Sequence, residues 1–282
     1  MLPGMRPGQA SQTAVRVCMG RALAHMALRN FEDPTAIALL PENARSRVEA
    51  VQQATPPKNL REKMQRAQLQ QLGLLMAART IEIDAAVRAA QHAQLVILGA
   101  GLDGRAWRMP ELKNSIVFEV DHPASQSDKR ARVPALTQHA GEVRFVPVDF
   151  EHDDLNAALD RAGHDITRAT TWIWEGVVMY LDLPAIEASL SIIARRSAPG
   201  SRLIVFYHRP AWFLHLIGFG VRRLGEPLRS AFTSEQMRAL LNRHGFSVVR
   251  DEDLPAIGAR LGPQIERGMR WMRHCRIVTA DR

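Results

Sequence analysis

A short apolar segment that runs directly into a glycine-rich turn constrains the fold of this chain more than any other feature. The segment Leu95-Val96-Ile97-Leu98 is apolar at every position, which is typical of a strand buried on both faces of a parallel sheet. Gly99, Gly101 and Gly104 follow it in the spacing G-x-G-x-x-G. Glycines so placed let the backbone turn tightly and approach a ligand closely. The pattern predicts a strand, a ligand-binding loop and a helix in succession.

Apolar runs of similar length recur along the rest of the chain, with helix-like segments between several of them. They lie at residues 116–120, 143–148, 171–174, 203–207, 246–249 and 275–279. A helix is expected from Leu183 to Arg196, with Pro184 in its first turn, and another after the capping-box pattern that begins at Thr233. This alternation predicts an α/β fold with a mainly parallel sheet covered by helices on both faces.

The residues before the first strand have a different pattern. Apolar positions recur at helical spacing, and Pro34, Pro41 and Pro56-Pro57 divide the region into shorter pieces. We therefore expect a mostly helical region over residues 1–92 and a ligand-binding core over residues 93–282, together forming one compact unit.

A segment at about residues 209–230 interrupts the alternation of strands and helices. It combines aromatic residues, among them Trp212 and Phe219, with the pair Arg222-Arg223. We interpret it as an inserted flap that closes an apolar pocket over an anionic ligand.

The charge and cysteine content exclude several classes of protein. The net charge is +8, yet only four residues are lysines and the arginines are scattered, without the dense basic, aromatic-interleaved runs of a nucleic-acid surface. The two cysteines, Cys18 and Cys275, cannot form a disulfide framework or a cysteine zinc site. The sequence shows no secretory signal and no membrane-length apolar stretch. We expect a cytoplasmic protein with no metal, nucleic acid or membrane partner.

The acid that follows the second strand narrows the choice of ligand. Asp121 lies 22 residues after Gly99, where a carboxylate accepts hydrogen bonds from ribose hydroxyls. A nicotinamide dehydrogenase would suit this position, but the Tyr-x-x-x-Lys pair of short-chain reductases is missing, and Asp103 and Arg105 would crowd a pyrophosphate. S-adenosylmethionine (SAM) has no phosphate, and its sulfonium cation favours nearby carboxylates. The loop therefore favours SAM, with an NAD(P)-dependent oxidoreductase as a remote alternative.

Several further segments resemble the leucine carboxyl methyltransferase family, in particular its bacterial branch of SAM-dependent enzymes. They occur in the family's order over roughly residues 14–250. They are Arg21-Ala22, Asp33-Pro34, Ala78-Arg79-Thr80, the run from Leu98 to Arg108, and the runs at 118–123, 146–150 and 174–181. The resemblance implies a seven-stranded class I methyltransferase fold (Rossmann-like) with SAM as cofactor, and it implies that the helices of residues 1–92 form a cap or lid on the core. One departure is Gly104, where members usually carry threonine or serine, so a hydroxyl near the cofactor is lost.

The resemblance also implies roles for individual residues in binding SAM. Arg79 is expected to pair with the methionine carboxylate, and Asp121 to bind the ribose. Asp149 is expected to accept a hydrogen bond from the adenine amino group, with Phe150 packing beside the ring or simply in the core. Glu175 is expected to hold the methionine amino group or to lie near the sulfonium.

Candidates for contact with the methyl acceptor are less sharply defined. Tyr180 matches a family position that faces the reaction centre, and His208 and His122 follow strand ends, where either is a candidate general base. A carboxylate acceptor needs no base, whereas a hydroxyl acceptor does. We therefore expect O-methylation of a small-molecule carboxylate or acidic hydroxyl, in specialised metabolism. Methylation of a protein C-terminus is the alternative, and an RNA-modifying enzyme or a non-enzymatic SAM sensor is more remote.

Overall fold

The computed structural model describes residues 11–53, 56, 59–150, 152–211 and 228–282. Within these ranges seven strands form one sheet in the order β3-β2-β1-β4-β5-β7-β6. They are β1 (Gln94–Leu98), β2 (Ile116–Asp121), β3 (Glu142–Pro147), β4 (Thr170–Trp174), β5 (Arg202–His208), β6 (Ser247–Asp253) and β7 (Cys275–Asp281). The first five strands pair in parallel, whereas β7 is antiparallel to both β5 and β6. The predicted mainly parallel, seven-stranded α/β sheet is confirmed.

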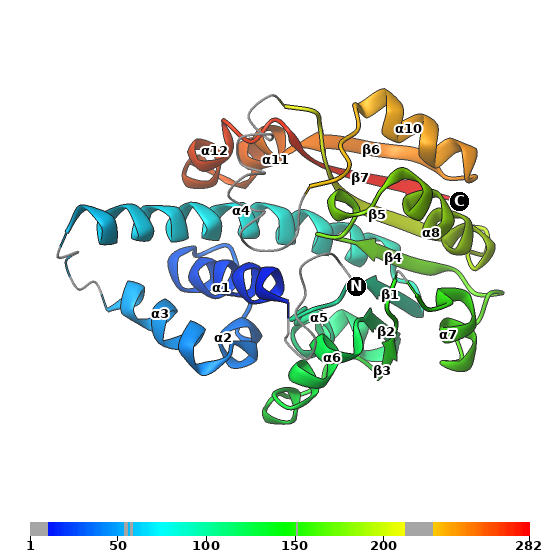
Figure 1. Cartoon of the computed structure of the whole chain (residues 1–282), viewed down its shortest axis with the longest axis horizontal. Helices are drawn as coiled ribbons and strands as arrows, with labels where there is room; N and C mark the ends of the chain where they lie inside the picture. Colours follow the sequence, from blue (N-terminus) through cyan, green and yellow to red (C-terminus); the bar gives the residue numbers. More distant parts are fainter. Residues whose placement is uncertain (1–10, 54–55, 57–58, 151, 212–227) are drawn as a thin grey trace.

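Helices precede the sheet and connect its strands (Figure 1). Before β1 lie α1 (Gln12–Ala27), α2 (Thr35–Leu39), α3 (Glu42–Gln52) and α4 (Leu60–Ala90). Between and after the strands lie α5 (Arg105–Arg108), η1 (Pro110–Asn114), α6 (Pro123–Arg130), η2 (Val133–Ala135), α7 (Leu155–Arg161), η3 (Val178–Tyr180), α8 (Leu183–Arg195), α10 (Ser234–Arg243), α11 (Leu254–Leu261) and α12 (Pro263–Met269). The capping box predicted at Thr233 is present, with Gln236 as its second member.

The sheet carries apolar side chains on both faces because successive residues of a strand point to opposite sides. In β1, Leu95 and Ile97 join a cluster that includes residues of α4, α11 and α12. Val96 and Leu98 join a second cluster with residues of α7, α8 and α10. A helical layer therefore covers each face, which is why the strand needs an uninterrupted apolar sequence.

The long helix α4 connects the N-terminal helices to the sheet, as Figure 1 shows. It packs against α1 and also contacts β4, β5 and β7. Asn59 caps its start by accepting a hydrogen bond from the Glu62 amide at 2.9 Å, and Gln91 ends it in a left-handed conformation with φ of 51°. A third apolar cluster joins α1, α2 and α3 to Leu102 of the glycine loop. The N-terminal helices thus rest directly on that loop.

Two details differ from the sequence-based picture or lie beyond it. The helix after the glycine loop, α5, has only four residues, because Pro110 follows and the chain continues as the 3-10 turn η1. Of the proposed flap at about residues 209–230, residues 212–227 lie outside the described residues.

Candidate active site

The glycine loop joins the carboxyl ends of β1 and β2. The amides of Gly99 and Ala100 donate to the carbonyl of Val120 at 2.8 and 3.1 Å, which ties the loop to the second strand. Asp121 accepts hydrogen bonds from the Gly101 amide and, at 2.6 Å, from the His122 amide. Burial raises the pKa of Asp121, although both N–H donors oppose the shift. An ionised carboxylate has roughly four acceptor positions, so Asp121 retains capacity for ligand donors.

Close packing explains why two positions of the loop are glycine. Gly99 has φ of 68°, and a Cβ atom there would lie 2.3 Å from Cγ2 of Val177. A Cβ on Gly104 would lie 2.0 Å from Oγ1 of Thr35. The threonine or serine hydroxyl expected from the family at position 104 therefore has a counterpart, because Thr35 brings a hydroxyl to the same place from the N-terminal region.

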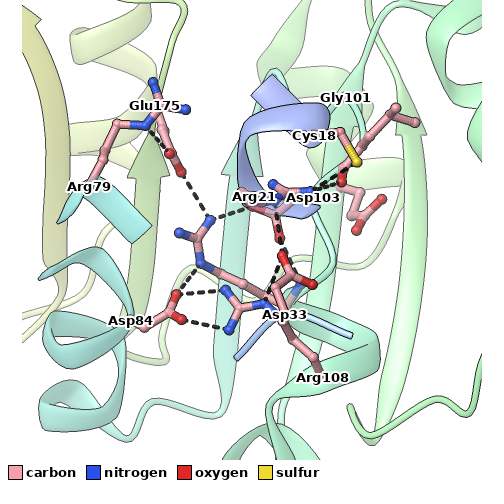
Figure 2. A network of polar contacts seen from close by, with 12 residues as sticks. Cys18, Arg21, Asp33, Arg79, Asp84, Gly101, Asp103, Arg108 and Glu175 are labelled. Atoms are coloured by element: carbon pink, nitrogen blue, oxygen red, sulfur yellow. Dashed lines mark hydrogen bonds and ion pairs between the residues drawn. The ribbon is translucent and has the colours of Figure 1, made fainter. Parts of the chain in front are cut away.

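Arg79 and Glu175, which are 96 residues apart in sequence, form an ion pair beside the loop (Figure 2). Nε of Arg79 lies 2.5 Å from Oε1 of Glu175, and its guanidinium carbon lies 5.0 Å above the ring of Phe206. Both charged side chains are largely buried. Within the described part of the chain, the two terminal nitrogens of Arg79 have no hydrogen-bond partner. They form a planar pair of donors suited to a bidentate carboxylate.

A continuous series of buried ion pairs extends from this pair toward the N-terminal helices. Arg105 contacts Glu175, Asp103 and Asp84, and its Nε lies 2.7 Å from Oδ1 of Asp84. Arg108 binds both oxygens of Asp84, at 2.6 and 3.0 Å.

Asp33 continues the series, because its Oδ2 lies 3.5 Å from Nε of Arg108 and 2.9 Å from Nε of Arg21. Arg21 in turn donates to the carbonyl of Leu102 in the glycine loop. Figure 2 shows that these side chains converge from the N-terminal helices, α4, the loop and the end of β4.

The network is balanced in charge, which makes its burial tolerable. Its four arginines face four carboxylates: Arg21, Arg79, Arg105 and Arg108 against Asp33, Asp84, Asp103 and Glu175. Burial alone would raise the pKa of each carboxyl group. For Glu175, Arg79 and Arg105 outweigh burial and lower its pKa below the ordinary range. The same holds for Asp103, where Arg105 is the main opposing charge.

The network also corrects one step of the sequence-based reasoning. Asp103 and Arg105 were expected to crowd a pyrophosphate from within the loop. Instead they pair with each other, and their side chains are 6% and 1% exposed. Their charged groups therefore stabilise the loop through a buried ion pair.

The residues predicted to bind the nucleoside lie at the end of β2 and shortly after β3. Nε2 of His122 lies 3.9 Å from Oδ2 of Asp149, and Phe150 packs half-buried against the second apolar cluster. The amide of Val148 donates to the carbonyl of Asp121 at 2.9 Å, which links the ends of β2 and β3. The fold therefore brings Asp121 and Asp149 to neighbouring strand ends.

The two residues predicted to act on the acceptor follow β4 and end β5. Tyr180 ends η3 and packs half-buried against the first apolar cluster. His208 stacks edge-to-face on Phe206 at 5.5 Å and on His274 at 5.6 Å. Burial lowers the pKa of His208 to about 4, so its imidazole is neutral near pH 7. Its buried Nδ1 has no hydrogen-bond partner within the described ranges.

Other members of the network were not singled out as site residues from sequence. Asp84 lies on α4 five residues after Arg79, a spacing that does not place the two residues on one helix face, so no local pattern indicates that Asp84 belongs with the site. Arg105 and Arg108 stand in the glycine-loop motif, but their partners are distant in sequence.

A comparison of the sequence with models of known families identifies the family of this chain. The leucine carboxyl methyltransferase profile matches residues 14–194. The chain belongs to the leucine carboxyl methyltransferase family. The expectation drawn from its motifs is therefore confirmed at the level of the family.

Several bacterial proteins resemble the chain over part of their length. A Mycolicibacterium gilvum protein is 39% identical over 180 residues, which are 62% of this chain and 58% of that protein. A Mycobacterium marinum protein is 43% identical over 127 residues, 45% of this chain and 41% of that protein. Both bear the name "Putative S-adenosyl-L-methionine-dependent methyltransferase". The matched region thus spans about half the length of these relatives.

Solved structures support the fold of this leucine carboxyl methyltransferase family member. A DUF574 family protein from Streptomyces avermitilis has a TM-score of 0.60 at 15% identity, covering 93% of this chain and 96% of its own. A Thermobifida fusca protein whose structure is described as that of a methyltransferase has a TM-score of 0.59 at 15% identity, covering 99% of this chain and 97% of its own. The predicted class I methyltransferase fold is confirmed. Among the helices described, none is both long enough and apolar enough to cross a membrane.

Proposed function

We propose that this protein is a SAM-dependent O-methyltransferase that acts on a small anionic acceptor in specialised metabolism. The Arg79–Glu175 ion pair beside the glycine loop carries the proposal. It presents two unengaged guanidinium nitrogens next to a carboxylate, which complements the carboxylate and ammonium groups of an amino acid. The methionine part of SAM has both groups. The name of the mycobacterial relatives supports the same cofactor.

The remaining cofactor contacts follow the neighbouring strand ends. We assign the ribose hydroxyls to Asp121, whose carboxylate retains acceptor capacity, and the adenine amino group to Asp149 with Phe150 beside the ring. Gly99 and Gly101 allow the backbone to approach the ligand between these groups. The helices before β1, over residues 1–92, act as a cap on the core over residues 93–282.

For methyl transfer, the main task of the protein is to orient the acceptor relative to the methyl group of SAM. SAM supplies a methyl group on a positively charged sulfur, which is a good leaving group. The chain's residues have to hold the acceptor oxygen in line at roughly 3–3.5 Å from that methyl group. We assign this contact to Tyr180. His208 is neutral at pH 7 and accepts the proton when the acceptor is a hydroxyl, whereas a carboxylate acceptor reacts without a base.

Calorimetric titration with SAM and with NADH tests the cofactor. We expect SAM to bind and Arg79→Met to weaken it about 10- to 100-fold, since a charge-assisted contact contributes about 1.5–3 kcal/mol. Arg88→Met is a matched control, because Arg88 lies on the same helix and pairs with Glu111 at the surface. Saturable NADH binding without SAM binding would overturn the proposal.

A screen with labelled methyl groups then tests the acceptor. Carboxylic acids and phenols are compared in the wild type and in His208→Gln. Loss of His208 should lower kcat about 10²- to 10⁴-fold for a hydroxyl acceptor, the contribution of a general base, and should leave a carboxylate acceptor nearly unchanged. Methylation of neither class would contradict a small anionic acceptor.

A groove on the N-terminal helices favours a second candidate, methylation of a protein C-terminus. It has a volume of about 720 Å³ and lies between α1, α3, α4 and α6. Arg16 and Arg47 line it without an ion pair to any described residue, and Leu69 and Leu72 also line it. Such a groove suits an acidic peptide. If Arg16→Glu with Arg47→Glu lowers kcat/KM for peptide acceptors and spares small acids, the peptide is the substrate.

A further inference from the structure

Arg105 is the most highly connected arginine of the buried network. Its Nε binds Oδ1 of Asp84 at 2.7 Å, and its Nη1 binds Asp103 and, at 3.0 Å, Oε2 of Glu175. The side chain is 1% exposed. The Arg105 amide also donates to Oδ1 of Asp103 at 2.8 Å. Carboxylates from α4 and from the glycine loop thus fix the guanidinium before it reaches Glu175.

The two arginines that hold Glu175 differ in their other partners. Arg79 contacts Oε1 of Glu175 and stacks on Phe206, and no other described carboxylate faces it. A ligand carboxylate can therefore bind the terminal nitrogens of Arg79, while Glu175 stays at its Nε. Arg105 is already neutralised by Asp84 and Asp103, so an incoming anion gains little from it.

We propose that Arg105 is a positioning residue, which Asp84 and Asp103 fix so that it holds Glu175 toward the ammonium group of the cofactor. Arg79 engages the cofactor's carboxylate, while Arg105 keeps the Glu175 carboxylate in place. This assignment rests on the proposed function. Under this assignment, Arg79 contacts the amino-acid part of the cofactor directly, whereas Arg105 acts on it only through Glu175.

The charges around Glu175 support this division. Burial is the largest influence on the Glu175 carboxyl group and raises its pKa, and the nearby Asp103 raises it further. The cations Arg79, Arg105 and Arg21 lower this pKa. The net result is a pKa of Glu175 below the ordinary value. If Arg105 no longer reaches Glu175, the carboxyl group keeps Asp103 nearby and loses one of its two closest cations. Its pKa then rises, and a neutral Glu175 no longer attracts an ammonium group.

The test compares Arg105→Lys with Arg108→Lys. Both residues lie on α5, are 5% exposed or less and bind Asp84, but only Arg105 contacts Glu175. Lysine keeps the charge but lacks the planar guanidinium through which Arg105 binds Asp84, Asp103 and Glu175 at the same time. Binding of S-adenosylhomocysteine, which carries the amino-acid group, and of methylthioadenosine, which lacks it, is measured by calorimetry from pH 5.5 to 8.

We expect Arg105→Lys to weaken S-adenosylhomocysteine about 10- to 100-fold, and increasingly as the pH falls, with methylthioadenosine within about twofold of wild type. Arg108→Lys should lower the thermal midpoint similarly but leave both affinities and their pH dependence unchanged. If Arg105→Lys does not fold, Asp103→Asn, which removes one clamp on Arg105, should weaken only S-adenosylhomocysteine. Equal weakening by both lysine variants, or none by Arg105→Lys, refutes the role of Arg105. Wild-type protein that binds neither compound refutes the proposed function itself.

Discussion

Replacing Gly104 by alanine places a methyl group where the Thr35 hydroxyl lies. The new Cβ would be 2.0 Å from Oγ1 of Thr35, 3.2 Å from its Cβ and 3.4 Å from Oδ1 of Asp33. Gly104 has φ of −105° and ψ of 2°, a conformation open to alanine. The cost therefore comes from the side-chain contact and not from the backbone.

The expected magnitudes follow from these distances. Overpacking of this kind costs about 1–3 kcal/mol, so Gly104→Ala should lower the free energy of unfolding by that amount. Thr35→Ala removes the hydroxyl and its 2.6 Å hydrogen bond to Asp33, which costs about 1.5–3 kcal/mol because the acceptor is charged. In the double variant the closest oxygen is gone, so Gly104→Ala should add less than about 1 kcal/mol.

Urea unfolding of the four proteins, followed by fluorescence, measures this coupling directly. The slope with denaturant should stay constant while the midpoints shift. We expect the double variant to lose roughly 1–2 kcal/mol less unfolding free energy than the sum of the two single losses. If Gly104→Ala costs the same with and without the Thr35 hydroxyl, the contact does not determine the residue at position 104.

Three further perturbations test other parts of the structure. Burial lowers the pKa of His208 from 6.5 to about 4, so the unfolded chain binds this proton first and stability falls as the pH drops from about 6.5 to 4. His208→Gln should remove up to about 3 kcal/mol of that dependence in urea titrations at each pH, and an unchanged profile would contradict it. Lys129→Met leaves Glu119 buried without its 2.6 Å partner and should cost about 3–5 kcal/mol, most of it regained by adding Glu119→Leu; a double variant as unstable as the single would argue against the pair. Gly99→Ala combines a positive φ with the 2.3 Å approach to Val177 and should cost about 2–5 kcal/mol and abolish SAM binding in a calorimeter. Wild-type affinity would show that the loop relaxes freely.

The strands were predictable where burial shapes the sequence. For β1 the apolar run at residues 95–98 matches the observed Gln94–Leu98 closely, because both faces of that strand are covered. For β6 the prediction of residues 246–249 falls short of the observed Ser247–Asp253. Its second half is charged and lies at the edge of the sheet, where backbone pairing with β7 defines the strand. The hydrophobic pattern of the sequence therefore does not predict that the second half of β6 is a strand. Helices α11 and α12 were also not expected from the pattern.

The site was predictable only in part, for a related reason. Glycines and strand-end acids occupy positions that topology dictates, so spacing alone predicts that Gly99 and Gly101 lie in the loop after β1 and that Asp121 lies at the end of β2. The ion pairs depend on which side chains meet across the fold. Asp84 meets Arg105 over 21 residues and Glu175 meets Arg105 over 70. No local pattern in the chain indicates these partners.

The charge-balanced network also determines which parts of this protein can be exchanged with a relative. Asp33 belongs to the segment before α2, yet it neutralises both Arg21 of α1 and Arg108 of α5. A chimera that imports the N-terminal helices without an acid at position 33 would leave the buried Arg21 without its carboxylate partner and Arg108 with Asp84 alone. Removing one partner of a buried ion pair typically costs about 3–5 kcal/mol. Recombination breakpoints between α3 and α5 should therefore succeed only where the donor and recipient carry matching charges on both sides.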